Sequence, residues 1–267
     1  MSVDVHAQQF HRRQDMKAAL RLIGLIVLAG IALQLYFVGR IALMAVLAPE
    51  STAFQRSEIY RITAVTGSLK WRQQWVPYDQ ISDNLKRAVI ASEDASFADH
   101  DGVDIEALEK AWDKNAKAEQ RTQQSASRLS PGKSTVAPRI APKTPKIVGG
   151  STITQQLAKN LFLSGERTLL RKGQELVLTL MLEALLRKER ILEIYLNNVE
   201  LGEGVFGVEA AAQHYYRKSA SRLSAYEAAR LAVMLPRPKY FETRAGSAYL
   251  ASRAGTIAAR MSDVSLP

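Results

Sequence analysis

The chain has 267 residues, of which 36 are Lys or Arg and 26 are Asp or Glu, so its formal net charge is +10. With 47% hydrophobic and 23% charged residues, it is neither a disordered nor a collagen-like chain. The lack of cysteine excludes disulfides and thiolate sites, four histidines without a His-x-x-x-His pair argue against a zinc enzyme, and the positive charge favours a polyanionic partner.

An apolar segment near the amino terminus is the first element of the chain. Residues 22–39 lie between Arg21 and Arg40 and include only one strongly polar residue, Gln34. As a helix they would be about 27 Å long, close to the hydrocarbon thickness of a bilayer. A cleaved signal peptide has a shorter apolar core, and a buried globular helix is rarely apolar all round. We therefore predict a cytoplasmic tail at 1–21 and an uncleaved transmembrane helix at 22–44.

The charges around this segment indicate its orientation. Four basic residues precede it and two follow within a short distance, namely Arg12, Arg13, Lys17 and Arg21, then Arg40 and Arg56. By the positive-inside rule, the amino terminus lies in the cytoplasm and the rest of the chain lies outside.

The remainder of the chain is predicted to be mainly α. Residues 45–79 form a stalk with β-like runs at 59–65 and 71–76, and the helical pattern begins at residue 80. Asp104 is a candidate helix cap, and Ser224 with Glu227 is a candidate capping box. Helices are predicted at 83–94, 105–112, 151–163, 169–197, 205–216, 224–234 and 245–261.

A basic segment interrupts the helical region. Residues 113–148 contain eight Lys or Arg, two acids and four of the nine prolines of the chain. This composition predicts a mobile loop. It is either a solvated linker or a segment attracted to anionic lipid headgroups.

Glu93–Gly102 concentrates acidic side chains after an apolar helix. Four acids and His100 stand within nine residues, and crowded carboxylates raise one another's pKa. Such a cluster is either a solvated loop or a site where one carboxylate is tuned as a base, and the spacing alone favours the loop.

Gly149–Asn160 predicts a helix with one polar face. Thr152, Gln156, Lys159 and Asn160 share this face at about 100° per residue, and apolar residues occupy the other. The preceding glycines would let an anion approach the free N–H groups of the first turn. An ordinary amphipathic helix is the alternative, but uncharged hydrogen-bonding groups with one cation favour binding of a polar ligand.

Arg171 and Glu175 stand four residues apart on a predicted helix. They form either a surface ion pair or a guanidinium fork for phosphate beside a carboxylate. Residues 190–212 indicate a structural role. Ser130–Lys133 and Ser82–Asn84 match penicillin-binding motifs in reversed order, which we attribute to chance.

Together, four ordered motifs resemble those of peptidoglycan glycosyltransferases (glycosyltransferase family 51), in particular the monofunctional biosynthetic peptidoglycan transglycosylases of Gram-negative bacteria. The motifs are Glu93-Asp94-x-x-Phe97-x-x-His100-x-Gly102, Gly150–Asn160, Arg171-Lys172-x-x-Glu175 and Ile191-Leu192-Glu193-x-Tyr195-Leu196-Asn197. The resemblance implies a lysozyme-like glycosyltransferase domain at 80–262 with a membrane-associated jaw, in which 113–148 is an extended insert.

The resemblance also implies an activity and a location. The family polymerises lipid II into linear glycan strands by inverting transfer, with release of undecaprenyl diphosphate. The expected partners are lipid II, the growing strand, membrane lipids, and cell-division or elongation proteins, with no nucleic acid. The catalytic domain would lie in the periplasm, anchored to the inner membrane. No cofactor is expected to be required, although a divalent cation such as Mg²⁺ is compatible with the site.

By the same resemblance, Glu93 is the catalytic base and Glu175 the second catalytic carboxylate. Lys159 and Arg171 match residues that hold the diphosphate. Other substrate-binding positions are Asp94, Phe97, His100, Thr152, Gln156 and Asn160. The alternatives are a lytic transglycosylase or lysozyme-like enzyme, which needs no diphosphate clamp, and a non-enzymatic membrane scaffold.

Overall fold

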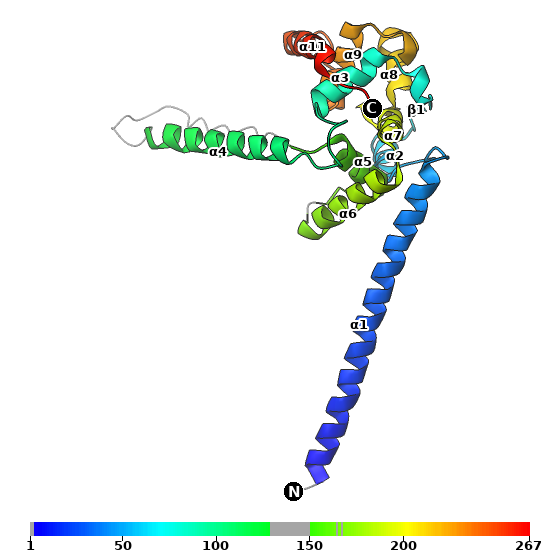
Figure 1. Cartoon of the computed structure of the whole chain (residues 1–267), viewed down its shortest axis with the longest axis vertical. Helices are drawn as coiled ribbons and strands as arrows, with labels where there is room; N and C mark the ends of the chain where they lie inside the picture. The colour runs from blue at the N-terminus through cyan, green and yellow to red at the C-terminus, as the bar shows by residue number, and fades with distance from the viewer. Residues whose placement is uncertain (1–2, 129–149, 164, 167) are drawn as a thin grey trace. The chain divides into compact units, whose positions relative to one another are not determined.

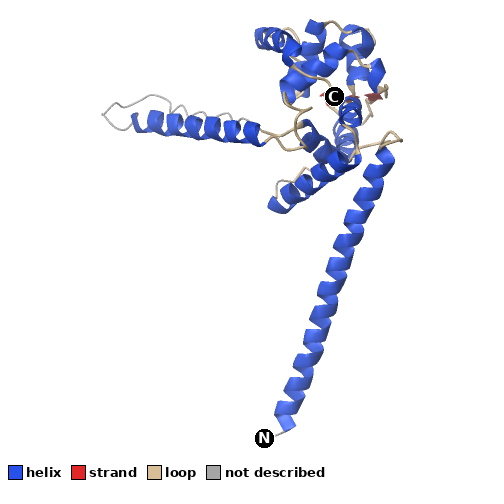
Figure 2. Cartoon of the chain, in the orientation of Figure 1, coloured by secondary structure: helices blue, strands red, loops and turns tan. Residues whose placement is uncertain are grey.

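A computed structural model describes residues 3–128, 150–163, 165–166 and 168–267 (Figure 1). Within the first of these ranges, side chains are described for residues 16–121. Two compact units make up the chain, 1–48 and 49–267. Helices dominate both units, as predicted, and the strands are short (Figure 2).

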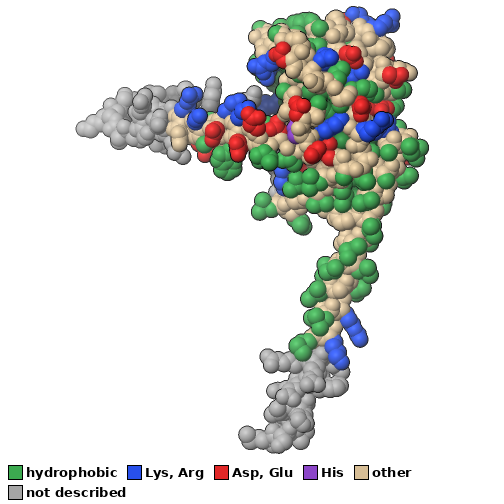
Figure 3. All heavy atoms as spheres, in the orientation of Figure 1, with side chains coloured by type: hydrophobic (Ala, Val, Ile, Leu, Met, Phe, Trp, Pro, Cys, Tyr) green, Lys and Arg blue, Asp and Glu red, His purple; other side chains and the backbone are tan. Residues whose placement is uncertain are grey.

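The first unit is the single helix α1 (Val3–Met44). Its Met16–Met44 part has a mean hydropathy of 2.3 and is long and apolar enough to cross a membrane. Hydrophobic side chains stand exposed along it (Figure 3). The predicted helix at 22–44 is confirmed, and it continues further towards the amino terminus.

The second unit begins with α2 (Ala53–Thr66), where β-like structure was predicted for 59–65. That prediction is wrong because Thr52 and Gln55 form a capping box that starts a helix upstream, and Ile62 then packs in the core. A tertiary contact of this kind overrides the β propensity of isoleucine, threonine and valine.

Three short strands form a small sheet: β1 (Arg72–Gln73), β2 (Glu200–Gly202) and β3 (Val205–Phe206). Their order is β1-β3-β2, with β1 parallel and β2 antiparallel to β3. Trp71 stacks on Phe206 with ring centroids 4.3 Å apart. The helix predicted from residue 205 therefore starts later, as α8 (Val208–Tyr216).

Helices of the carboxyl-terminal half pack on one another and on α3 (Asp83–Glu93). α9 (Ala225–Met234) packs against α3 and α11 (Ala248–Arg260). The predicted capping box of Ser224 and Glu227 is present at the start of α9. The short α10 (Pro238–Glu242) follows α9, and 3-10 turns lie at Tyr78–Gln80, Ala220–Arg222 and Met261–Asp263.

The single helix predicted over 169–197 is two helices, α6 (Leu169–Leu185) and α7 (Lys188–Asn198). Leu186 leaves the helical conformation with a φ of −122° and is 6% exposed. No glycine or proline marks this break, and the helix ends where the side chain of Leu186 enters the core.

Two more helices carry the motif residues, α4 (Ile105–Arg128) and α5 (Ile153–Phe162). Asp104 caps α4 as predicted, since its carboxylate accepts from the N–H of Ala107 at 2.7 Å. The first part of the predicted basic loop, 113–128, is helical, because the helix-forming sequence that follows Trp112 continues α4. The remainder, from 129, with the Ser130–Lys133 motif, lies outside the described residues.

Candidate active site

Glu93 is the last residue of α3. Its Oε2 accepts a hydrogen bond from Nε2 of Gln156 at 3.0 Å, and Ser92 Oγ lies 3.4 Å from Oε1. Burial raises the pKa of Glu93 above its usual value, although these two hydrogen bonds act in the opposite direction. A half-buried carboxylate with a raised pKa suits a general base.

Gln156 connects Glu93 to α7. Its Oε1 accepts from the hydroxyl of Tyr195 at 3.0 Å. Tyr195 is 1% exposed, and burial raises its pKa well above the usual value, so the phenol stays protonated. Three helices, α3, α5 and α7, therefore meet at Glu93 through one hydrogen-bonded chain.

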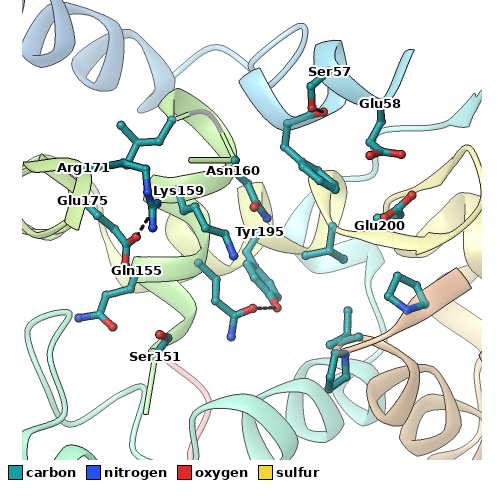
Figure 4. Close-up of a pocket in the computed structure, with 18 of the residues that line it drawn as sticks. Ser57, Glu58, Ser151, Gln155, Lys159, Asn160, Arg171, Glu175, Tyr195 and Glu200 are labelled. Atoms are coloured by element: carbon teal, nitrogen blue, oxygen red, sulfur yellow. Dashed lines mark hydrogen bonds and ion pairs between the residues drawn. The ribbon is translucent and has the colours of Figure 1, made fainter. Parts of the chain in front are cut away.

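A cavity of about 670 Å³ opens beside this chain (Figure 4). One wall carries Lys159, Arg171 and Lys172. Glu175 is 4% exposed; it pairs with Arg171 at 3.1 Å and also with Lys172. Three cations against one carboxylate leave this wall with a positive charge. We call it the cationic wall.

Lys159 makes no ion pair with any described residue. Its side chain is exposed to the cavity, but neighbouring protein atoms displace part of its water, and this desolvation lowers the pKa of Lys159. The neighbouring Arg171 acts in the same direction, and Glu175 opposes it. A phosphate group at the cationic wall would supply the missing anion.

The opposite side of the cavity is acidic and was not predicted. Glu58 and Glu200 line it, as Figure 4 shows, and Lys239 forms an ion pair with both. Burial raises the pKa of Glu200 to about 7. These residues fall between or outside the four motifs, so no sequence signal marked them.

A second cavity of about 520 Å³ contains Glu93 itself. Lys110 and Lys114 of α4 line it as well, and Ser151 lines both cavities. Glu93 thus faces one cavity and reaches the other through Gln156. The two cavities adjoin at Ser151, so the site offers two neighbouring spaces on either side of the hydrogen-bonded chain.

Asp94 holds the loop after α3 against the start of α5. Its carboxylate accepts from the N–H of Ile153 at 2.9 Å and from Nε2 of His100 at 2.8 Å. Nδ1 of His100 accepts from the N–H of Gly102, so Nε2 carries the hydrogen. The prediction of a free helix start for a ligand anion is wrong at Ile153, because Asp94 is already the anion there.

The structure divides the predicted site residues into three groups. Gln156, Lys159, Asn160, Arg171 and Glu175 line the first cavity, and Glu93, Asp94 and Thr152 line the second. Thr152 caps α5 and donates to the carbonyl of Gly102 at 2.7 Å. Phe97 and His100 line neither of these cavities. Phe97 is fully buried beneath Lys188, whose Nζ lies 4.5 Å from the ring centroid, so it supports the loop rather than contacting a ligand.

Two groups of side chains bring carboxylate or imidazole atoms within 4.8 Å of one another in the described residues: Asp94, His100 and Asp104, and Glu58, Glu200 and Glu203. Neither group includes Glu93 or Glu175. Both already have protein partners, the N–H of Ile153 in the first and the ammonium of Lys239 in the second.

Comparison with known proteins adds a family to this geometry. The Transglycosylase family model matches residues 61–137 and 135–262. The biosynthetic peptidoglycan transglycosylase of Burkholderia thailandensis is 54% identical over 239 residues, which cover 90% of this chain and 84% of the relative. Those of Burkholderia pseudomallei and Burkholderia multivorans are 53% and 51% identical over the same share of this chain, and over 84% and 87% of their own lengths.

Proposed function

This chain belongs to the transglycosylase family and is a peptidoglycan glycosyltransferase, and we propose that it polymerises lipid II with Glu93 as its base. The observation that carries the proposal is the hydrogen bond that Gln156 donates to Glu93, because Gln156 lies on α5 and lines the first cavity together with Lys159. The proton acceptor and the cationic wall therefore lie on two adjoining cavities, which Gln156 connects.

Glu93 takes the proton of the acceptor sugar's 4-hydroxyl while that oxygen attacks the anomeric carbon of the donor. The new glycosidic bond forms as the bond from that carbon to the diphosphate oxygen breaks, and the configuration inverts. Undecaprenyl diphosphate leaves with its negative charge, which Lys159 and Arg171 stabilise.

Glu175 acts in this proposal through the cations it contacts. A buried carboxylate that pairs with Arg171 and Lys172 holds both side chains on the cationic wall. A diphosphate is a good leaving group that requires charge stabilisation more than a proton. The site therefore needs no acid of the kind that glycoside hydrolases use.

An exposed apolar surface beside the cationic wall supports a lipid-linked substrate. Leu169 and Leu170, at the start of α6, are 93% and 86% exposed, directly before Arg171 and Lys172. Leucines this exposed beside cations are typical of a surface that meets a membrane. They would allow the lipid tail to stay in the bilayer while the diphosphate reaches the wall.

The proposed location rests on the candidate membrane span in α1. We propose a single-pass protein of the bacterial inner membrane with a cytoplasmic amino terminus and a periplasmic catalytic unit, supported by the excess of basic residues before the span. Cell-division or elongation proteins are proposed partners, and membrane lipids are proposed to contact the basic insert.

The experiment is turnover of lipid II in detergent, with glycan products separated by length. The variant Glu93→Gln should lose at least about a hundredfold in rate, the range for a general base, while Glu109→Gln on the exposed side of α4 keeps full activity. Full activity of Glu93→Gln would refute the role of Glu93. Cleavage of purified glycan strands would instead favour the lytic alternative, which the family match does not support. We propose that no resident cofactor is required and that a divalent cation such as Mg²⁺ is compatible with the site; rates with and without EDTA measure whether such a cation contributes.

A further inference from the structure

Tyr195 is buried in α7 and lines the first cavity rather than the second, and it belongs to the hydrogen-bonded chain that ends on Glu93. We infer that Tyr195 is a positioning residue that fixes the amide of Gln156 and thereby keeps Glu93 oriented and ionised for catalysis. This inference rests on the proposed role of Glu93 as base.

The direction of the first hydrogen bond follows from burial. Tyr195 lines the first cavity but is only 1% exposed, and Oε1 of Gln156 is the hydrogen-bond acceptor of its hydroxyl in the described part of the chain. If the amide were flipped, its NH₂ group would face the phenol and the O–H would lose this acceptor. A buried O–H without an acceptor is unfavourable, so the phenol selects one amide orientation.

The selected orientation determines what Glu93 receives. With Oε1 turned to Tyr195, Nε2 of Gln156 donates to Oε2 of Glu93 at 3.0 Å. An N–H donor stabilises the ionised carboxylate. The flipped amide would present Oε1, which repels a carboxylate but accepts from a protonated one. Tyr195 therefore favours the form of Glu93 that can take a proton.

Other groups also act on Glu93 and stay in place when Tyr195 changes. Ser92 donates to its other oxygen, Asp94 raises its pKa, and Arg253 of α11 lowers it. The second cavity adds further charged side chains, namely Asp99, Asp104, Glu106, Lys110 and Lys114. Wild type and Tyr195→Phe share all of these groups, so a difference between their pH profiles reports the contribution of the phenol.

The variant Tyr195→Phe removes only the hydroxyl. We expect the acidic limb of the pH profile of kcat for lipid II polymerisation to move up by about one pH unit, the value of one charge-assisted hydrogen bond. On the acidic side the rate should fall about tenfold, and at higher pH it should approach that of the wild type. Tyr215→Phe is the control, since that hydroxyl donates to the carbonyl of Leu201 away from Glu93.

A double variant separates action through Gln156 from a general effect on folding. Gln156→Leu should move the same limb, and Tyr195→Phe combined with Gln156→Leu should move it no further. Thermal melting of each variant accompanies the kinetics, because a packing defect would lower the Tm without moving the limb.

The outcomes distinguish the inference from the proposal beneath it. The positioning role is refuted if Tyr195→Phe leaves the acidic limb at the wild-type pH. It is also refuted if the acidic limb of the double variant lies at a higher pH than that of Gln156→Leu. In both cases Glu93 remains the base. If Glu93→Gln keeps both the wild-type rate and the acidic limb, Glu93 is not the base, and the proposed function of this site is refuted before the role of Tyr195 is tested.

Discussion

The contact of Asp94 with α5 leads to a quantitative prediction. Asp94 is 6% exposed, and its carboxylate accepts two hydrogen bonds, from Ile153 at 2.9 Å and from His100 at 2.8 Å. In Asp94→Asn, the carbonyl oxygen can keep one of these bonds. The new NH₂ group then faces a second N–H donor, so the other bond is lost and a buried donor is left unsatisfied.

The expected cost follows from the loss of one charge-assisted hydrogen bond, about 2 kcal/mol. In a folded unit of this size, a loss of 1 kcal/mol lowers the Tm by about 2–4 °C, so Asp94→Asn should melt about 4–8 °C below the wild type. Activity should fall as well, because the loop that Asp94 holds begins directly after Glu93.

The assay is thermal unfolding of the detergent-solubilised protein, followed by circular dichroism at 222 nm. The matched control is Asp99→Asn in the same loop, where the side chain is exposed, and its Tm should change by less than about 1 °C. If Asp94→Asn also stays within about 1 °C of the wild type, Asp94 does not hold α5 as described, and our explanation of its burial is wrong.

Three further predictions concern Glu93, Lys159 and Gly204. Because folding raises the pKa of Glu93, the wild type loses stability as the pH rises from the ordinary glutamate pKa through the pKa in the folded protein. In thermal melts, Glu93→Gln should therefore be more stable than the wild type at about pH 8 and no more stable at about pH 4. Equal melting temperatures of the two proteins at both pH values would contradict the raised pKa. Because the pKa of Lys159 is lowered, this side chain loses its charge at a lower pH than a free lysine does. In Lys159→Arg the alkaline limb of the pH–rate profile should move to higher pH, since arginine stays charged. An unchanged limb would show that another group causes it. Gly204 has a φ of +71°, and a Cβ there would lie 1.9 Å from the carbonyl oxygen of Lys70. In urea unfolding, Gly204→Ala should therefore lower the free energy of unfolding by about 3 kcal/mol or more, whereas Gly255→Ala, where a Cβ meets open space, should not. Equal stabilities of the two variants would refute the close approach.

The sequence predicts elements whose signals are local. The capping box at Ser224 and the cap at Asp104 fix helix starts by contacts within four residues, and the structure has both. The break at Leu186 has no local signal, since neither glycine nor proline stands there and the residue is buried. The run at 59–65 is helical despite its β-like composition, because the decisive residues, Thr52 and Gln55, precede it.

The site shows the same division. Helical periodicity placed Gln156, Lys159 and Asn160 on one face, and all three line the first cavity. Periodicity could not reveal that Asp94 accepts from Ile153, 59 residues away, or that Tyr195 donates to Gln156, 39 residues away. These contacts depend on tertiary folding, which spacing along one helix does not encode.

The arrangement of α5 has a consequence for inhibition. Gln156 and Lys159 stand within one turn of the same helix, so the partner of the proposed base and one cation of the wall move as a rigid body. A compound that tilted this helix slightly would disturb proton removal and leaving-group departure simultaneously. Resistance to such a compound would be difficult to evolve, because a substitution that restored one of these alignments would not by itself restore the other.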